Sequence, residues 1–237
     1  MKRAHMMRAH KMQAYIMRAL IFDFDGLILE TEEPIYRSWQ EIYNLFGQDL
    51  PLEEWAPVVG TSDHIDPLAM LEQRVGKALD RPALAARRKS MEKALIETQP
   101  TLPGVEQYLR DARRLGIKTA VASSSSGGWV VGHLERLGLR AYFDCIRVRE
   151  NVTLTKPDPA LFLAAAECLG VKPAEAIVLE DSTNGILAAK RAGMFCVAVP
   201  NAITCLFDLS LADLRVRSLA ELPLEDLLRL ASPPIRP

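Results

Sequence analysis

Short apolar runs alternate with helical patterns along most of this 237-residue chain, and no other feature constrains its fold as strongly. Apolar runs of strand length are found at 19–22, 117–122, 145–148, 176–179 and 195–199, with a weaker one at 214–216. Helical patterns are found at 105–115, 129–137, 159–169, 184–192 and 224–231. Strands that alternate with helices build a parallel sheet with helices on both faces. We therefore expect an α/β fold with a doubly wound, Rossmann-like parallel sheet.

The segment 33–100 interrupts this alternation, because it holds helical patterns and no strand pattern. Apolar residues recur there at helical spacing, as in the series Ile35, Trp39, Ile42 and Phe46. We predict that 33–100 is an inserted all-helical domain. The α/β core then comprises residues 17–32 and 101–237.

The first sixteen residues have a composition of their own. They hold four basic residues and no acidic one: Lys2, Arg3, Arg8 and Lys11. A secretory signal peptide would need an apolar segment and a small-residue cleavage site, and neither is found there. We expect residues 1–16 to be a disordered or non-native extension, with the fold beginning at Met17.

The composition is that of an ordinary soluble globular protein, with 49% hydrophobic and 25% charged residues. A net charge of −1 argues against nucleic acid or a membrane surface as partner. No apolar stretch approaches the roughly 20 residues that span a bilayer. The cysteines form no CxxC pair and no cluster with histidine, so we predict free thiols in a reducing cytoplasm and no zinc site: Cys145, Cys168, Cys196 and Cys205.

Polar residues follow several of the predicted strands. Asp23 and Asp25 come after the first, Ser123 and Ser124 after the second, and the pair Glu180-Asp181 after the fourth. The carboxyl ends of parallel strands meet at one edge of a sheet, where ligands bind, so these side chains should converge. Side chains two apart on a strand also point the same way. The alternative for the first pair is two solvated aspartates in a turn.

Carboxylates, a hydroxyl and a lysine, Lys156, suit phosphoryl transfer. A hard cation such as Mg²⁺ prefers oxygen ligands and would offset the repulsion between an anionic nucleophile and a phosphate. That repulsion is about 4 kcal/mol per charge pair at 4 Å in a surface-like dielectric. One carboxylate can attack phosphorus, and a second acid can protonate the leaving oxygen. No histidine occupies these positions, and we expect His64 and His133 to be ordinary surface or packing residues.

In its motifs the chain resembles the haloacid dehalogenase-like hydrolase superfamily, in the helical-cap branch of phosphoglycolate phosphatases and β-phosphoglucomutases. The resemblance covers 17 to about 225 and is carried by four motifs in order: Asp23-Phe24-Asp25-Gly26, Ser123 after an apolar strand, Lys156-Pro157, and Glu180-Asp181-Ser182 with Gly185 and Ala192-Gly193 downstream.

The resemblance implies a role for each motif residue. Asp23 would be the nucleophile and a metal ligand, and Asp25 the general acid/base, whose backbone carbonyl also reaches the metal. Asp181 would be a metal ligand, with Glu180 either a ligand or a supporting neighbour. Substrate would be held by Ser123, Ser124, Lys156 and Thr31. The segment 33–100 would be the cap.

The function implied is a Mg²⁺-dependent phosphatase that hydrolyses a small phosphorylated metabolite through an aspartyl-phosphate. One alternative is a phosphosugar mutase, although Ile35 and Asp63 stand where the mutases of this branch have a histidine and an arginine. Another is a non-catalytic binding protein on the same fold. We expect a cytoplasmic monomer or weak homodimer that binds neither nucleic acid nor membrane. The candidate selectivity residues are Thr31, Trp39, Thr61, Ser62 and His64.

Overall fold

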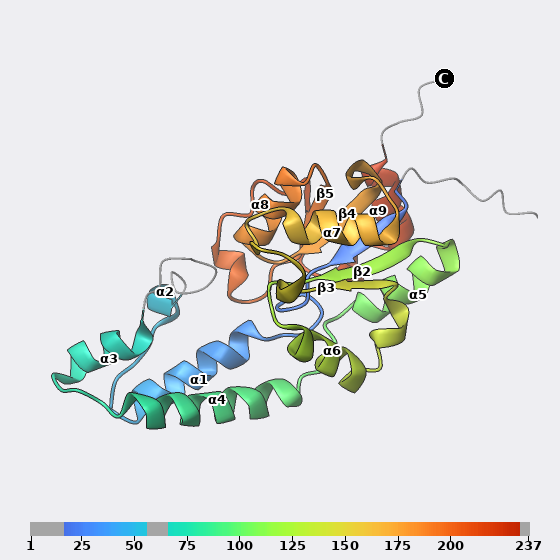
Figure 1. The fold of residues 1–237 in the computed structure, drawn as a ribbon. Helices are drawn as coiled ribbons and strands as arrows, with labels where there is room; N and C mark the ends of the chain where they lie inside the picture. The colour runs from blue at the N-terminus through green and yellow to red at the C-terminus, as the bar shows by residue number, and fades with distance from the viewer. Residues whose placement is uncertain (1–16, 56–65, 233–237) are drawn as a thin grey trace, which may run out of the picture.

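The computed structural model describes residues 17–55 and 66–232 of the chain, so residues 1–16 and the candidates Thr61, Ser62, Asp63 and His64 lie outside the described residues. The described part contains one parallel sheet (Figure 1) of strands β1 (Ala19–Phe22), β2 (Lys118–Ala122), β3 (Cys145–Arg147), β4 (Ala176–Glu180), β5 (Phe195–Ala198) and β6 (Leu214–Arg215). The strand order is β3-β2-β1-β4-β5-β6, so successive strands step outward from β1 in both directions. The expected doubly wound parallel sheet is confirmed.

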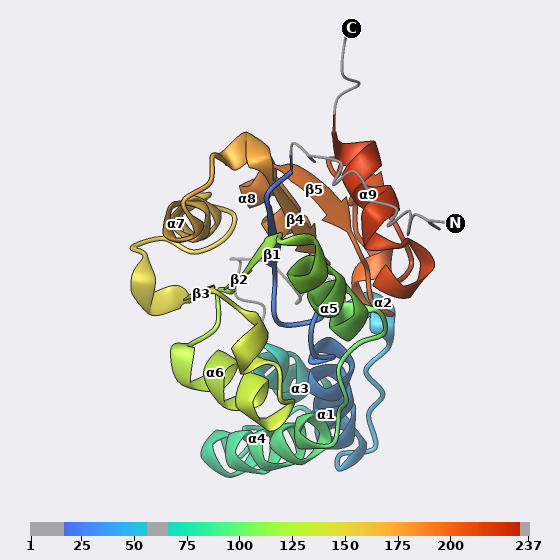
Figure 2. The same ribbon diagram turned by 90° about the vertical axis from the view of Figure 1, so that its right-hand side faces the viewer.

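Helices cover both faces of the sheet (Figure 2). On one face lie α5 (Val105–Leu115), α6 (Gly127–Arg136) and α9 (Leu224–Ala231). On the other lie α7 (Ala160–Leu169) and α8 (Thr183–Arg191). Short 3-10 turns complete this part of the chain: Arg140–Tyr142, Arg149–Asn151, Pro173–Glu175, Thr204–Leu206 and Leu219–Glu221.

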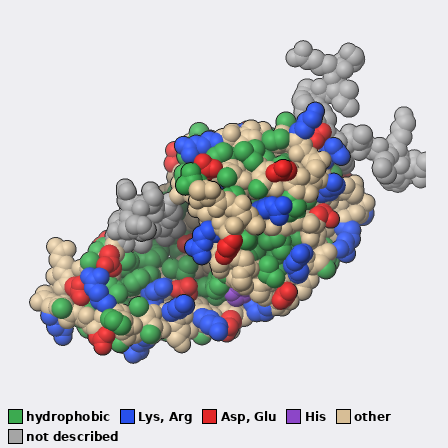
Figure 3. Space-filling model, viewed as in Figure 1, with side chains coloured by type: hydrophobic (Ala, Val, Ile, Leu, Met, Phe, Trp, Pro, Cys, Tyr) green, Lys and Arg blue, Asp and Glu red, His purple; other side chains and the backbone are tan. Residues whose placement is uncertain are grey.

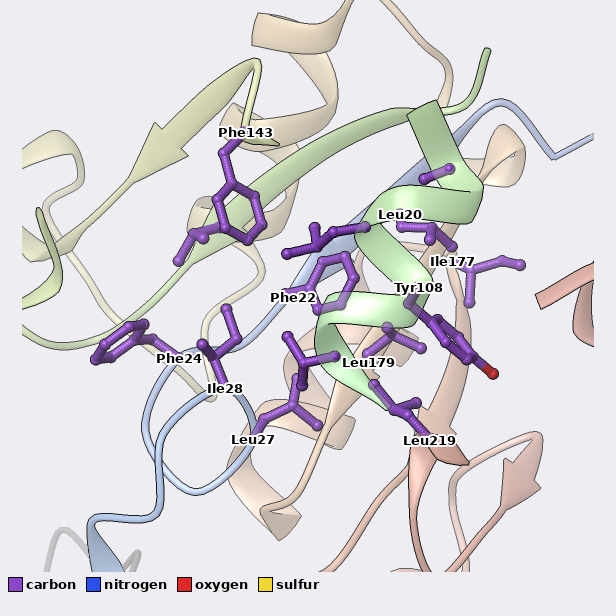
Figure 4. Close-up of a cluster of buried hydrophobic side chains, with 14 of the residues drawn as sticks. Leu20, Phe22, Phe24, Leu27, Ile28, Tyr108, Phe143, Ile177, Leu179 and Leu219 are labelled. Carbon is purple, nitrogen blue, oxygen red and sulfur yellow. The ribbon is translucent and has the colours of Figure 1, made fainter. Parts of the chain in front are cut away.

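The alternation of side chains along β1 explains why this strand is apolar throughout. Leu20 and Phe22 pack under α5, and Ala19 and Ile21 pack under α7 and α8, so every residue of the strand is buried. Figure 4 shows the first of these clusters, in which the Tyr108 hydroxyl points to the edge and donates a hydrogen bond of 2.6 Å to the Leu222 carbonyl. Each large side chain buried there contributes about 1.5–3 kcal/mol.

In the sheet and its covering helices, the predicted element boundaries differ from the observed ones by at most two residues. The helix predicted at 129–137 begins earlier, at Gly127, because the Ser126 hydroxyl accepts a hydrogen bond from the Trp129 N–H and caps it. The helix predicted to begin at Pro159 begins at Ala160, whose N–H donates to the Asp158 carboxylate at 2.9 Å.

Among the described residues, four helices lie between β1 and α5 and are called here the helical block: α1 (Glu32–Asn44), α2 (Leu52–Trp55), α3 (Pro67–Val75) and α4 (Arg81–Glu97). In both ribbon views α1 and α4 lie side by side and the block extends away from the sheet (Figures 1 and 2). The block has its own apolar cluster, which includes Ile42, Trp55 and Leu71 and also Ile203 from the loop after β5. The two parts are therefore packed against each other there.

The chain enters and leaves the block through two neighbouring segments. The Leu102 N–H donates to the Ile28 carbonyl at 2.9 Å, and Leu29 and Thr101 form a β-bridge. The two connections are therefore held together at the base of the block. On the face seen in Figure 3, acidic and basic side chains are interspersed over both parts.

Two of the four cysteines form a disulfide, so the prediction of free thiols was wrong for Cys145 and Cys168. The packing of α7 against β3 brings these residues together, with their Cα atoms 6.3 Å apart, although they are 23 positions apart in the sequence. A spacing rule such as CxxC does not detect a pair that only tertiary packing creates. Cys196 and Cys205 are free.

Within residues 17–55 and 66–232, no helix combines the length and apolarity that a membrane crossing requires.

Candidate active site

The loops after β1, β2 and β4 and the loop before α7 meet at one pocket of about 1030 Å³. Parallel strands bring their carboxyl ends to this edge of the sheet, which is where ligands bind in such folds. Of the residues to which the resemblance gives a catalytic, metal-binding or substrate-binding role, all but Glu180 line the pocket: Asp23, Asp25, Thr31, Ser123, Ser124, Lys156 and Asp181. Glu180 lies directly beneath it, fully buried.

Lys156 lies at the centre of a buried charge cluster. Its ammonium group donates to the Asp23 carboxylate and, at 2.5 Å, to Glu180 Oε1. The side chain is only 6% exposed, so it carries an ion pair that water screens little. Burial alone would lower the pKa of Lys156, but Asp23 and Glu180 raise that pKa above its ordinary value. The Lys156 side chain therefore stays protonated beside Asp23, the residue that follows β1.

Carboxylates outnumber cations in this cluster. Oxygens of Asp23, Glu180 and Asp181 all lie within 4.8 Å of one another. Burial, together with the neighbouring Glu180 and Asp25, raises the pKa of Asp23 to about 8 against the opposing effect of Lys156. Burial, Glu180 and Asp23 raise the pKa of Asp181 well above its ordinary value. A group of oxygen donors with excess negative charge fits a hard divalent cation such as Mg²⁺.

Glu180 is held from several sides. Its Oε2 accepts hydrogen bonds of 3.0 Å from the Asp181 and Ser182 N–H groups and from the Ser182 hydroxyl. The first turn of α8 lies so close that a Cβ on Gly185 would be 1.8 Å from Glu180 Oε1, and only glycine fits there. Through these contacts Glu180 orients both Lys156 and the turn after β4.

Asp181 is oriented by the loops around it. The Asn201 side-chain amide donates to its Oδ2 at 2.8 Å. Gly26 has a positive φ of 78°, and a Cβ there would lie 2.2 Å from the same oxygen. The glycine after Asp25 is thus required both by its backbone conformation and by the approach of Asp181. Sequence reasoning did not identify Asn201, which no motif marks.

Asp25 faces a different set of partners, on the segment that runs from the end of β2 into the first turn of α6. Its Oδ1 accepts from the Trp129 indole N–H at 2.8 Å, and its Oδ2 accepts from the Ser125 hydroxyl at 2.6 Å and the Ser123 hydroxyl at 3.4 Å. Asp23 and Asp25 therefore do not share partners. Ser125 and Trp129 were missed from the sequence, which marked only Ser123 and Ser124 in this segment.

The helical block supplies one wall of the pocket through Glu32, Ile35 and Glu92, and Thr31 lines it directly before α1. Thr31 is buried, and its hydroxyl has no hydrogen-bond partner among the described residues. The candidate Trp39 instead packs within the block, with its ring 6.2 Å from that of Trp55.

Comparison with known proteins agrees with this geometry. The chain matches the family described as "Haloacid dehalogenase-like hydrolase" over residues 20–199. A Bacillus subtilis (strain 168) protein named "Putative phosphatase YhcW" is 46% identical over 210 residues, which cover 89% of this chain and 96% of that protein. Hexitol phosphatase B of Escherichia coli (strain K12) is 32% identical over 216 residues, which cover 89% of this chain and 96% of that protein.

A solved structure shows the same fold. The HAD family hydrolase from Deinococcus radiodurans R1, crystallised with bound phosphate and sodium, has a TM-score of 0.77 at 28% identity and covers 92% of this chain and 97% of that one. The family match extends from β1 through β5, so it includes the segments that supply Asp23, Lys156 and Asp181. The chain belongs to the haloacid dehalogenase-like hydrolases.

Proposed function

We propose that the protein is a Mg²⁺-dependent phosphatase that hydrolyses a small phosphorylated metabolite through an aspartyl-phosphate. The observation that carries the proposal is the buried cluster of Asp23, Glu180 and Asp181 around Lys156. The relatives named as phosphatases support it. Mg²⁺ would be held by Asp23, Asp181 and the Asp25 backbone carbonyl, and when bound it would supply positive charge beside the phosphoryl group.

The protein's own residues divide the remaining work. Asp23 attacks phosphorus, and the ester bond to the leaving oxygen breaks as the acyl phosphate forms. Lys156 and Ser123 hold phosphoryl oxygens. Asp25 gives a proton to the leaving oxygen and then takes one from the water that hydrolyses the acyl phosphate. Glu180 keeps Lys156 in place through their hydrogen bond.

We infer that the helical block, the predicted domain 33–100, acts as a cap over this site. Glu32, Ile35 and Glu92 of the block line the pocket together with residues of the core. The paired connections at Ile28 and Leu102 suit a movement that opens and closes the pocket. Ile35, an apolar residue in the wall where mutases of this branch have a histidine, favours a phosphatase over a mutase.

Hydrolysis of p-nitrophenyl phosphate with and without Mg²⁺ tests the proposal. Activity should require the metal, and Asp23→Asn should reduce it by at least about a thousandfold, because the nucleophile is lost. The exposed Asp49, changed to asparagine, is the matched control and should leave the rate unchanged. Equal rates in wild type and Asp23→Asn would overturn the assignment of the nucleophile.

Location and oligomeric state stay predictions: a cytoplasmic monomer or weak homodimer. Disulfides such as Cys145–Cys168 persist mainly in oxidising compartments, so this bond counts against a cytoplasmic location. Measuring the thiol state of the protein in intact cells and its mass in solution tests both.

A further inference from the structure

The carboxylate of Asp25 is held at both oxygens by side chains from the segment 123–129. One oxygen, Oδ1, accepts from the Trp129 indole at 2.8 Å. The other, Oδ2, accepts from the Ser125 hydroxyl at 2.6 Å and the Ser123 hydroxyl at 3.4 Å. Nothing in the motifs of the sequence assigns a role to Trp129 or Ser125.

The two oxygens of Asp25 differ in what their partners can do. An indole N–H can donate a hydrogen bond but cannot accept one, whereas a hydroxyl can do both. The oxygen bound to Trp129 therefore cannot pass a proton to its partner. A proton on Asp25 is accommodated at Oδ2, where the Ser125 hydroxyl can turn and accept it as a hydrogen bond. Oδ2 also lies on the side of Ser123, the residue expected to hold phosphate.

Packing fixes the direction of the indole. Trp129 is in the first turn of α6, where its N–H donates to the capping Ser126 hydroxyl. Its ring meets the His133 ring edge to face, with centroids 4.3 Å apart, and His133 is itself buried against Phe24. The indole N–H is thus aimed at Asp25 by its place on α6 and by the His133 ring, which itself packs on Phe24.

We propose that Trp129 is a positioning residue that fixes the orientation of the Asp25 carboxylate, so that Oδ2 is the oxygen that exchanges protons during catalysis. This inference rests on the proposed phosphatase function. In the first step the proton moves from Oδ2 to the leaving oxygen while the phosphorus–oxygen bond breaks and the bond to Asp23 forms. In the second step water gives a proton to Oδ2, its oxygen bonds to phosphorus and Asp23 is released. Ser125 holds Oδ2 between the two steps.

The test compares two substrates of similar shape, phenyl phosphate and p-nitrophenyl phosphate. Phenolate leaves poorly without a proton, whereas p-nitrophenolate leaves readily. In rapid-mixing measurements with Mg²⁺, Trp129→Phe should slow the first turnover of phenyl phosphate about 10-fold or more, a part of what general acid catalysis contributes. The first turnover of p-nitrophenyl phosphate should slow by less than about 3-fold, because that step needs no proton. The KM of both substrates should change little.

Trp55→Phe is the matched control. The Trp55 indole N–H is buried and has no hydrogen-bond partner among the described residues, so its removal costs no contact there. This variant should show the same ratio between the two substrates as the wild type. Ser125→Ala should reproduce the substrate dependence of Trp129→Phe, and Ser125→Thr, which keeps the hydroxyl, should restore most of the lost rate.

Equal slowing of both substrates by Trp129→Phe and by Ser125→Ala, or no slowing by either, would overturn the positioning role. If Trp129→Phe melts at a much lower temperature than the wild type, Ser125→Ala decides the question alone. The proposed function fails separately, through a wild type without Mg²⁺-dependent hydrolysis or an Asp23→Asn variant that is fully active.

Discussion

Glu32 lies in the first turn of α1, where its carboxylate faces other acids. Burial and the nearby Asp25, Glu30 and Glu92 raise its pKa from 4.5 to about 7. Because the pKa is higher in the folded than in the unfolded protein, the folded state binds more protons between these values. Stability should therefore fall as the pH rises from about 4.5 to 7.

Glu32→Gln should remove this effect. At pH 8 the variant should be more stable than the wild type by on the order of 1–3 kcal/mol, and the difference should shrink toward pH 5. Urea unfolding at the two pH values measures it. Glu41→Gln, an exposed position on the same helix, is the control. If Glu32→Gln raises the free energy of unfolding equally at pH 5 and pH 8, removal of the Glu32 charge is not the cause.

Among single residues, the sequence predicts those whose place in the site follows from their position next to a strand. Asp23 and Asp181 directly follow strands, so the parallel sheet brings them to one edge, as the structure shows. Trp129 and Asn201 reach the site by the direction of a side chain from a helix or a loop. No local pattern encodes that direction, so both were missed.

Among the elements, α4 supplies one acidic residue of the pocket wall, Glu92. Arg88 contacts Glu92 one turn away, donates to the Ser38 hydroxyl at 3.3 Å and lies over the Trp39 ring, 4.9 Å from its centre. This arrangement holds Glu92 at the pocket, on the same wall as Glu32. Carboxylates there accept hydrogen bonds from hydroxyls and repel an anionic leaving group.

We expect the enzyme to prefer glycerol 1-phosphate over phosphoglycolate, because only the second has a carboxylate in its leaving group. Glu92→Gln should raise kcat/KM for phosphoglycolate relative to glycerol 1-phosphate by about 10-fold, which corresponds to about 1.4 kcal/mol of relieved repulsion. Glu97→Gln, at an exposed position on the same helix, should leave this ratio unchanged. An unaltered ratio in Glu92→Gln would mean that α4 does not select the substrate by charge.

The disulfide between β3 and α7 links two elements on the side of the sheet that carries Lys156. It closes a loop of 23 residues, for which chain entropy gives a stabilisation of about 3 kcal/mol. Cys145→Ser should lower the free energy of unfolding by roughly that amount, whereas Cys205→Ser, at an exposed free thiol, should not. Unfolded, unreduced protein should titrate with two thiols, Cys196 and Cys205. Four thiols without reductant would refute the bond.

For the whole molecule, sequence patterns predict the sheet and its helices well, since hydrophobic periodicity is a local signal. The contact between the two parts was not predictable in this way. Ile203 lies in a loop after β5, yet it is buried in the cluster of the helical block. Which loop touches a distant domain depends on the assembled fold, and the same holds for the meeting of Cys145 and Cys168.

The charge cluster of the active site couples the stability of the whole molecule to pH and to metal. Without metal, the pKa of Asp23 is about 8 and that of Asp181 is well above its ordinary value, mainly because both are buried. Both values exceed those of the unfolded chain, so the metal-free protein should lose stability as the pH rises from about 4 to 8. Mg²⁺ binds the deprotonated carboxylates and competes with protons for them.

Mg²⁺ should therefore raise the melting temperature more at pH 8 than at pH 5.5. At a concentration about 100 times the Kd the stabilisation is about 2.7 kcal/mol, or roughly 5–10 °C for a protein of this size. Asp181→Asn should melt higher than the wild type in EDTA at pH 8, because the variant lacks a buried carboxyl group whose pKa folding raises, and it should lose most of the Mg²⁺ shift. The exposed control Asp49→Asn should keep the wild-type melting temperature in EDTA and the wild-type Mg²⁺ shift. If Mg²⁺ raises the melting temperature equally at the two pH values, or still raises it in Asp181→Asn, the metal does not bind at this cluster.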